Sequence, residues 1–177
     1  THCKNMIEIG SKSFSFASKL FDTSVKDAAF CLYGWCRFCD DEIDKAKENR
    51  LEKVERLSHL TQSAYENRPQ LPTEFKALSL IVNQYKIPSY YPLELIEGMR
   101  MDAEGYQYET IDDLNLYCYR VAGVVGLMMS YIMGVSEQTA LKNAADMGTA
   151  MQMTNIARDI VEDFEMGRVY LPSQWLK

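Results

Sequence analysis

Apolar residues recur every three or four positions along almost the whole chain, which is the spacing that places them on one face of an α-helix. No stretch of useful length alternates apolar and polar residues in the manner of a half-buried strand. The pattern therefore predicts an all-α fold of roughly six helices. We expect these helices to span about 25–46, 50–66, 73–85, 92–104, 110–133 and 136–165.

Short polar, proline and glycine signals support the limits of these helices. Thr110, with Asp113 three residues later, is typical of a capping box at a helix start. Pro92 suits the first turn of a helix, because the backbone N–H that it lacks would have no partner there. Gly167 follows the last helical pattern and is expected to end it.

Composition places the chain among ordinary globular proteins. It has 177 residues, of which 47% are apolar and 25% charged, so residues 1–177 are expected to form a single domain. The net charge of −6 leaves no basic stripe to neutralise phosphates, which argues against a nucleic-acid partner. No run of about 18 apolar residues occurs and the first residues are polar, so we expect a cytoplasmic protein without a membrane span or signal peptide.

The cysteines fit a reducing compartment. There are five, an odd number, and Cys36 and Cys39 form a C-x-x-C pair. Neither a second pair nor a nearby His completes a zinc site. We therefore expect buried free thiols.

Two acidic clusters carry the strongest chemical signal. Asp40 and Asp44 lie four residues apart, as do Asp159 and Asp163, so the members of each pair lie one turn apart on one helix face. Like charges at this spacing repel, and both pairs fall near helix C-termini, where the helix dipole disfavours anions. A divalent cation would offset both costs, and such carboxylates suit Mg²⁺, which takes its other oxygens from water and substrate phosphates. The alternative interpretation is two solvated acidic helix ends.

Other polar residues lie on the same faces, before each Asp pair. Tyr33 and Arg37 precede the first pair, and Gln152 and Asn155 precede the second. Helices that are largely apolar around one polar stripe are expected to line a water-filled cavity. Arg158, beside the second pair, is suited either to a diphosphate oxygen or to a surface ion pair.

The segment between the two clusters is apolar and rich in small residues. Gly123 and Gly126 each weaken a helix by about 1 kcal/mol relative to Ala, which is tolerable where another backbone or a ligand approaches closely. Tyr117 and Val121 begin an apolar stripe on this helix. Core packing is its default interpretation. The alternative is a tunnel for an apolar chain, in which the Tyr117 ring would stabilise a carbocation by cation–π attraction.

Taken together, the motifs match one known family. They are the blocks Gly10–Phe14, Leu32–Asp44, Tyr117–Gly126, Thr154–Asp163 and Gly167–Pro172, which follow one another over essentially the whole chain. In these blocks the chain resembles the squalene/phytoene synthases, and most closely the bacterial-type phytoene synthases. The resemblance implies an all-α isoprenoid-synthase fold with a central cavity.

The resemblance also implies roles for individual residues. It implies that the metal ligands are Asp40, Asp44, Asn155, Asp159 and Asp163, of which the four Asp residues also serve catalysis. It implies that the substrate contacts are Ser13, Ser15, Tyr33, Arg37, Gln152 and Arg158. Tyr117 takes the position of a catalytic Tyr near the reacting carbons.

The implied activity is an Mg²⁺-dependent head-to-head condensation of two geranylgeranyl diphosphates to phytoene, for carotenoid biosynthesis. Mn²⁺ is an expected substitute, and no nicotinamide cofactor is expected. Because substrate and product are apolar, peripheral membrane contact stays open, although no basic amphipathic helix marks it.

Family members extend beyond the Gly167–Pro172 block, so we expect this chain to be a fragment without the C-terminal helices. Two alternative functions remain. One is a squalene or dehydrosqualene synthase acting on farnesyl diphosphate, and the other is a non-catalytic helical member of the family. Chain-elongating and cyclising prenyl-diphosphate enzymes fit less well, since they lack the Arg-Val-Ala-Gly block.

Overall fold

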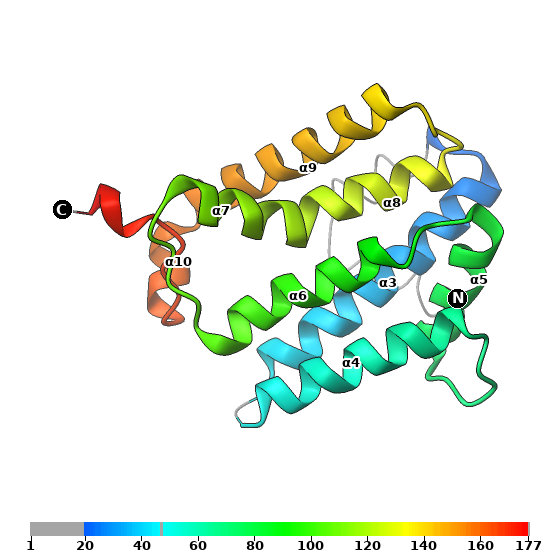
Figure 1. The fold of residues 1–177 in the computed structure, drawn as a ribbon, viewed down its shortest axis with the longest axis horizontal. Coiled ribbons are helices and arrows are strands. Elements are labelled where there is room, and N and C mark those ends of the chain that lie inside the picture. The colour runs from blue at the N-terminus through cyan, green and yellow to red at the C-terminus, as the bar shows by residue number, and fades with distance from the viewer. Residues whose placement is uncertain (1–19, 47, 177) are drawn as a thin grey trace. The chain divides into compact units, whose positions relative to one another are not determined.

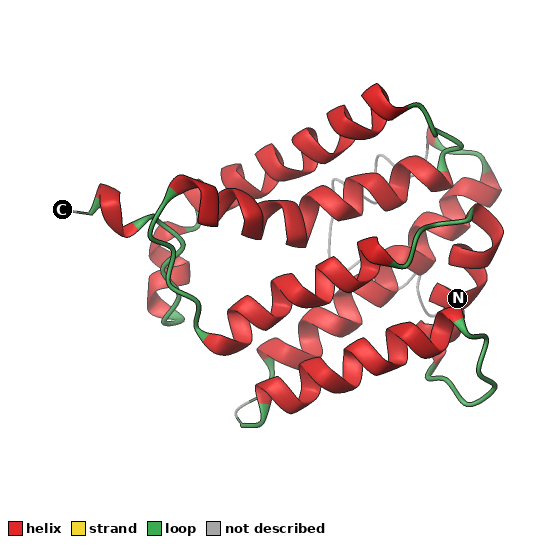
Figure 2. Cartoon of the chain, viewed as in Figure 1, coloured by secondary structure: helices red, strands yellow, loops and turns green. Residues whose placement is uncertain are grey.

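The computed structural model describes residues 20–46 and 48–176. Within these ranges the secondary structure is helical, with connecting loops and no strand, which confirms the predicted all-α class (Figure 2). The expected substrate contacts Ser13 and Ser15 lie outside the described residues. None of the described helices is long and apolar enough to cross a membrane.

The chain divides into two compact units. The first contains the described residues up to Ser89 together with Tyr131–Val135, and the second contains Tyr90–Ser130 and the residues from Ser136 onward. The expectation of a single domain stays a prediction.

The described part of the first unit contains three complete helices, α3 (Thr23–Asp44), α4 (Arg50–Tyr65) and α5 (Thr73–Tyr85) (Figure 1). Each packs against the other two. The sequence pattern predicted α4 and α5 to within one residue, and α3 begins two residues earlier than expected.

Aromatic side chains hold this unit together. Trp35 on α3 and Phe75 on α5 are fully buried, and the ring of Phe38 meets that of Phe75 edge-on at a centroid distance of 6.0 Å. Burying a side chain of this size contributes about 1.5–3 kcal/mol. The hydroxyl of Ser79 on α5 donates to the carbonyl of Ala64 on α4 at 2.6 Å, which fixes these two helices against each other.

The four cysteines within the described residues are free thiols, as predicted. Cys39 and Cys118 are buried, whereas Cys31 and Cys36 are partly buried. Burial is the main cause that raises the pKa of the Cys36 thiol to about 12, so this group stays protonated at neutral pH. Burial also raises the pKa of the Cys39 thiol, so both thiols of the C-x-x-C pair are protonated at neutral pH.

The second unit begins with α6 (Tyr90–Glu104), which is followed by a long helical path. This path consists of α7 (Ile111–Cys118), the π-helical turn η2 (Tyr119–Gly123) and α8 (Val124–Ile132), whose last residues fall in the first unit. The remaining elements are α9 (Gln138–Arg158), α10 (Ile160–Glu165) and the short 3₁₀ helix η3 (Ser173–Trp175) (Figure 1).

The start of α7 is a capping box, as predicted. The backbone N–H of Asp113 donates to the hydroxyl of Thr110 at 3.2 Å, and the Asp113 carboxylate accepts from the Thr110 N–H at 2.8 Å. The expected helix over 110–133 nevertheless contains a π-turn, in which the Val124 N–H donates to the carbonyl five residues earlier, that of Tyr119. One extra residue enters the helix there, and apolar spacing does not reveal it because both flanking segments keep a helical pattern.

The expected helix over 136–165 is also interrupted. It breaks at Asp159, whose backbone φ of −104° and ψ of 20° lie outside the helical range, and α10 begins at the next residue. Asp competes for backbone groups through its own side chain and favours helix ends, which explains the break. Gly167 ends α10 with φ of 78°, as predicted, and the Arg168 N–H then donates to the Asp163 carbonyl at 2.8 Å.

Glycines let η2 and α8 touch the backbone of α9. A Cβ atom on Gly126 would lie 2.5 Å from the carbonyl oxygen of Ala144, and one on Gly148 would lie 2.5 Å from that of Ala122. A Cβ on Gly123 would lie 2.9 Å from the hydroxyl of Thr149 and 3.2 Å from the backbone carbonyl oxygen of Ala145. The expectation that another backbone approaches Gly123 and Gly126 is therefore confirmed.

We expect Gly148→Ala to destabilise the protein by about 1–3 kcal/mol, because the added methyl group pushes α9 away from the Ala122 backbone. Alanine is a better helix former than glycine, so helix propensity alone predicts that the substitution stabilises the protein. Urea unfolding measures the difference. Asn143→Ala, at an exposed position of the same helix, is the control and should leave the midpoint unchanged or raise it. An unchanged midpoint for Gly148→Ala would contradict the close packing.

Candidate active site

The first Asp pair lies at the C-terminal end of α3 and is accessible to solvent. Asp44 is exposed, and the Asp40 side chain is 44% exposed. Arg37, one turn earlier, forms ion pairs with Asp40 at 3.0 Å and with Asp41 at 2.8 Å. Lys45 also contacts Asp41, at 2.8 Å. The predicted substrate contact Arg37 therefore lies beside the predicted metal ligand Asp40.

Tyr33 lies one turn before Arg37 on the same helix face and is half-buried. Burial is the main cause that raises the pKa of its phenol, and the positive charge of Arg37 opposes this shift. Tyr33 thus remains a neutral hydrogen-bonding group in this stripe.

The second Asp pair flanks the break between α9 and α10. The Asp159 carboxylate accepts two hydrogen bonds from Arg158, of which the one from Nε measures 2.6 Å. These bonds lower the pKa of Asp159. The pKa of Asp163 moves in the opposite direction, because partial burial and the charge of Asp159 both disfavour its ionised form. The Asp163 N–H donates to the Asp159 carbonyl at 2.8 Å, so the one-turn spacing survives the break.

Gln152 and Asn155 lie on α9, before this pair. Both are half-buried, and the Asn155 amide donates to the Gln152 carbonyl oxygen at 3.4 Å. The structure therefore brings Gln152 beside Asn155 and Arg158 beside Asp159, within the second unit. That Gln152, Asn155, Asp159 and Asp163 form one polar stripe stays a prediction.

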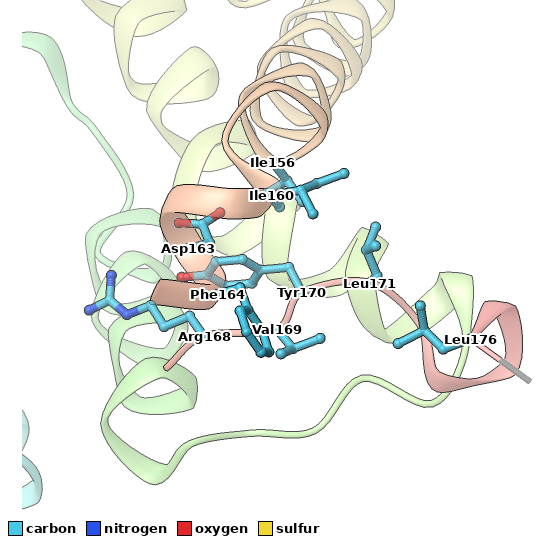
Figure 3. Close-up of a pocket in the computed structure, with 9 residues that line it drawn as sticks. All are labelled: Ile156, Ile160, Asp163, Phe164, Arg168, Val169, Tyr170, Leu171 and Leu176. Carbon is cyan, nitrogen blue, oxygen red and sulfur yellow. The ribbon is translucent and has the colours of Figure 1, made fainter. Parts of the chain in front are cut away.

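An apolar cavity of about 290 Å³ lies next to Asp163 (Figure 3). Apolar side chains dominate its wall, and Asp163 and Arg168 supply the charged groups. Its lining residues are Ile156, Ile160, Asp163, Phe164, Arg168, Val169, Tyr170, Leu171 and Leu176. Such a cavity places apolar surface beside a carboxylate of the predicted metal site.

Tyr117 lies in a buried aromatic cluster of the second unit and is only 4% exposed. Its hydroxyl donates to the Asp102 carboxylate at 2.9 Å and lies 3.2 Å from the hydroxyl of Tyr170. The rings of Tyr117 and Tyr170 stack at 5.0 Å. Tyr117 therefore packs in the core of the second unit, and a role for its ring beside the reacting carbons stays a prediction.

The chain matches a known protein family over most of its length. The family model for squalene/phytoene synthases matches residues 7–177. The chain belongs to this family. It is similar to the 15-cis-phytoene synthases of Pantoea ananas, at 44% identity over 99% of this chain and 60% of the relative, and of Enterobacter agglomerans, at 43% identity over 96% and 61%. The chain thus spans about three fifths of the length of these family members.

Solved structures of family members confirm the isoprenoid-synthase fold. A dehydrosqualene synthase in complex with a ligand matches with a TM-score of 0.87 and 32% identity, over 98% of this chain and 60% of that one. A squalene synthase from Alicyclobacillus acidocaldarius matches with a TM-score of 0.87 and 26% identity, over 97% and 65%.

The carboxylates of this family member fit a magnesium site by donor chemistry. Within the ranges that the structure describes, no group of three or more His, Cys, Asp or Glu side chains is placed to hold a metal by itself. Mg²⁺ usually needs only one or two protein carboxylates, because water and substrate phosphates complete its shell. Each Asp pair offers two such groups, and a cation would relieve the repulsion that raises the pKa of Asp163. The two pairs lie in different units, and a site shared between them stays a prediction.

Sequence reasoning missed two members of the Tyr117 cluster. Tyr170 lies in the Gly167–Pro172 block, but no helical spacing connects it with Tyr117, which is 53 residues away. Asp102 is a lone acidic residue within an amphipathic helix, where a solvated position is the ordinary expectation. Only its proximity to Tyr117 and Tyr170 in the fold reveals it.

We expect Arg158→Gln to raise the pKa of Asp159 toward the ordinary value of an Asp, because the bidentate partner is lost. The native ion pair stabilises the fold above the ordinary Asp pKa, and this contribution disappears as the pH falls through the lowered pKa. Carboxyl ¹³C NMR titration measures the shift. Lys142→Gln is the matched control, since Lys142 pairs with Asp146 on the same helix at 2.8 Å. An Asp159 titration that Arg158→Gln leaves unchanged would contradict the pairing.

Proposed function

We propose that the protein to which this chain belongs condenses two geranylgeranyl diphosphates to phytoene. The observation that carries the proposal is the 44% identity, over 99% of this chain, with a protein named 15-cis-phytoene synthase. The geometry of each unit supports it, because each presents a carboxylate pair with an arginine beside it, Arg37 in the first and Arg158 in the second.

In this proposal the oxygens of Asp40 and Asp44 in the first unit, and those of Asn155, Asp159 and Asp163 in the second, would hold Mg²⁺. Bound there, Mg²⁺ supplies positive charge that stabilises a departing diphosphate. Arg37 and Arg158 supply further positive charge. Arg37 is paired with Asp40 and Asp41, and Arg158 with Asp159, so both guanidinium groups can pass from Asp40 and Asp159 to diphosphate oxygens when those carboxylates turn to the metal. Serine side chains of the 10–16 segment, Ser13 and Ser15, add hydrogen bonds to a diphosphate.

The reaction then proceeds in two ionisations. The C1–O bond of one substrate breaks, the electron pair leaves with the diphosphate, and the allylic cation is captured by the double bond of the second substrate. Loss of one proton closes a cyclopropyl diphosphate. The second C–O bond then breaks, the cation rearranges, and loss of another proton gives phytoene, with diphosphate as the proton acceptor. The described residues include one His, His59, and no role in proton transfer is assigned to it. Diphosphate is therefore proposed as the proton acceptor.

The Tyr117 ring is proposed to stabilise these cations through its π-electrons. Its phenol stays protonated, because burial is the main cause that raises its pKa far above the ordinary value. A protonated phenol is a poor nucleophile, so the ring offers negative potential without capturing the cation.

A squalene-type activity on farnesyl diphosphate is the second candidate. The structural match to a dehydrosqualene synthase, at 32% identity and a TM-score of 0.87, supports it. The higher identity to phytoene synthases favours the longer substrate.

We expect the double variant Asp40→Asn and Asp159→Asn to lower phytoene formation at least 100-fold in the full-length gene product, because one carboxylate of each pair is lost. Chromatography of the products with saturating Mg²⁺ measures it. Glu162→Gln, at an exposed position beside the second pair, is the control and should retain turnover. Undiminished product from the double variant would refute the metal assignment. Thermal protection of the wild type by Mg²⁺ with diphosphate is the companion measurement, and its absence would favour a non-catalytic member.

We expect the same protein, offered equal amounts of geranylgeranyl and farnesyl diphosphate, to form a C40 product in large excess. A ratio of specificity constants of roughly tenfold or more is the expected size, since each methylene in an apolar pocket contributes about 1–3 kcal/mol. Mass spectrometry of the hydrocarbons distinguishes C40 from C30. A dominant C30 product would favour the squalene-type activity over phytoene formation. It would leave the family assignment unchanged.

A further inference from the structure

The carboxylate of Asp102 is held by two phenols. Its Oδ2 atom accepts from the Tyr117 hydroxyl at 2.9 Å, and its Oδ1 atom accepts from the Tyr170 hydroxyl at 3.1 Å. Each oxygen therefore takes one phenol, and the two phenolic oxygens lie 3.2 Å apart. This arrangement fixes the direction of the Tyr117 ring relative to a negative charge.

Aromatic contacts enclose this arrangement. The Tyr108 ring meets that of Tyr117 at 5.5 Å and that of Tyr170 at 5.7 Å, and all three side chains are buried. Burial is the main cause that raises the pKa of each of the three phenols, and the charge of Asp102 raises it further. The phenols therefore act as hydrogen-bond donors to the carboxylate and not as acids at neutral pH.

Three separate parts of the second unit supply the contacts. Asp102 lies in the last turn of α6, Tyr117 lies in α7, and Tyr170 follows α10. The cluster thus also ties these segments together, which is its simplest structural role. An apolar contact or a neutral hydrogen bond would serve that purpose, and a charge in a partly buried place is costly unless it is well satisfied.

We propose that Asp102 is a positioning residue that acts through Tyr117, holding its ring in place and raising the negative potential of that ring toward a carbocation. A phenol that donates to a carboxylate is polarised, so electron density on its oxygen and ring increases. A ring with more negative potential attracts a cation more strongly. The inference rests on the proposed function in one respect, the approach of a cationic carbon to Tyr117.

The test compares two ligands of the same shape in the full-length gene product. One is a prenyl ammonium analogue of the allylic cation, and the other is its uncharged carbon isostere. We expect Asp102→Asn to weaken binding of the ammonium analogue roughly tenfold, with the affinity for the neutral isostere changed less than about twofold. With geranylgeranyl diphosphate, kcat should fall by a similar factor while KM stays nearly unchanged.

Glu104→Gln is the matched control. It removes a carboxylate from the same helix, two residues from Asp102, at an exposed position. It should leave both affinities and kcat unchanged, which separates a local effect of Asp102 from a general loss of negative charge. Equal loss of the two ligands in Asp102→Asn would assign the residue a structural role only and overturn the proposal.

A second variant keeps the test decisive where Asp102→Asn does not fold. Tyr117→Phe retains the ring and removes its bond to Asp102, so it should show the same selective loss of the ammonium analogue. Unselective loss, or none, would overturn the proposal. Both ligands report on binding alone, so absence of phytoene from the wild type would refute the proposed function while the ligand comparison still decides the role of Asp102.

Discussion

Backbone-to-backbone contact between η2–α8 and α9 is the constraint on which the second unit depends. Without side chains at Gly126 and Gly148, the carbonyl oxygens of the facing helix come within 2.5 Å of the positions where Cβ atoms would stand. This close approach lets Ile156 on α9 join Tyr117 in one buried cluster. The second Asp pair begins three residues after Ile156. Its position is thus set by the same packing that buries Tyr117.

The charged groups follow a common arrangement in both units. Each Asp pair has an arginine on one carboxylate, Arg37 on Asp40 and Arg158 on Asp159. Exposed ion pairs of this kind stabilise a protein by little, about 0–1 kcal/mol. They nevertheless hold the guanidinium groups close to the carboxylates. In the proposed reaction the guanidinium groups would bind the diphosphate and the carboxylates would bind the metal. In the proposed reaction weak pairing is an advantage, because a strong pair would compete with the substrate and the metal for both partners.

Apolar spacing and end signals sufficed for most of the helical limits, since α4, α5 and the capping box at Thr110 follow from local chemistry alone. They did not reveal the π-turn of η2 or the break at Asp159, because one inserted or distorted residue leaves the apolar pattern on each side intact. The Asp pairs could be recognised from the sequence for a similar reason, because four-residue spacing is a local property. The bond between Asp102 and Tyr170 joins residues 68 positions apart and depends on the tertiary fold, so no pattern in the chain encodes it.

The place of Asp102 also bears on how a protein can stabilise a carbocation without consuming it. A carboxylate in direct contact with an allylic cation would form an ester with it, since the carboxylate oxygen is a nucleophile. In this cluster each oxygen of Asp102 accepts a hydrogen bond from one phenol, and the Tyr108 ring contacts the rings of both phenols. The charge can act through the Tyr117 ring while each carboxylate oxygen is held by a hydrogen bond. In the proposed reaction the ring, and not the carboxylate, would face the cation, and partial burial of Asp102 would strengthen its effect on the ring.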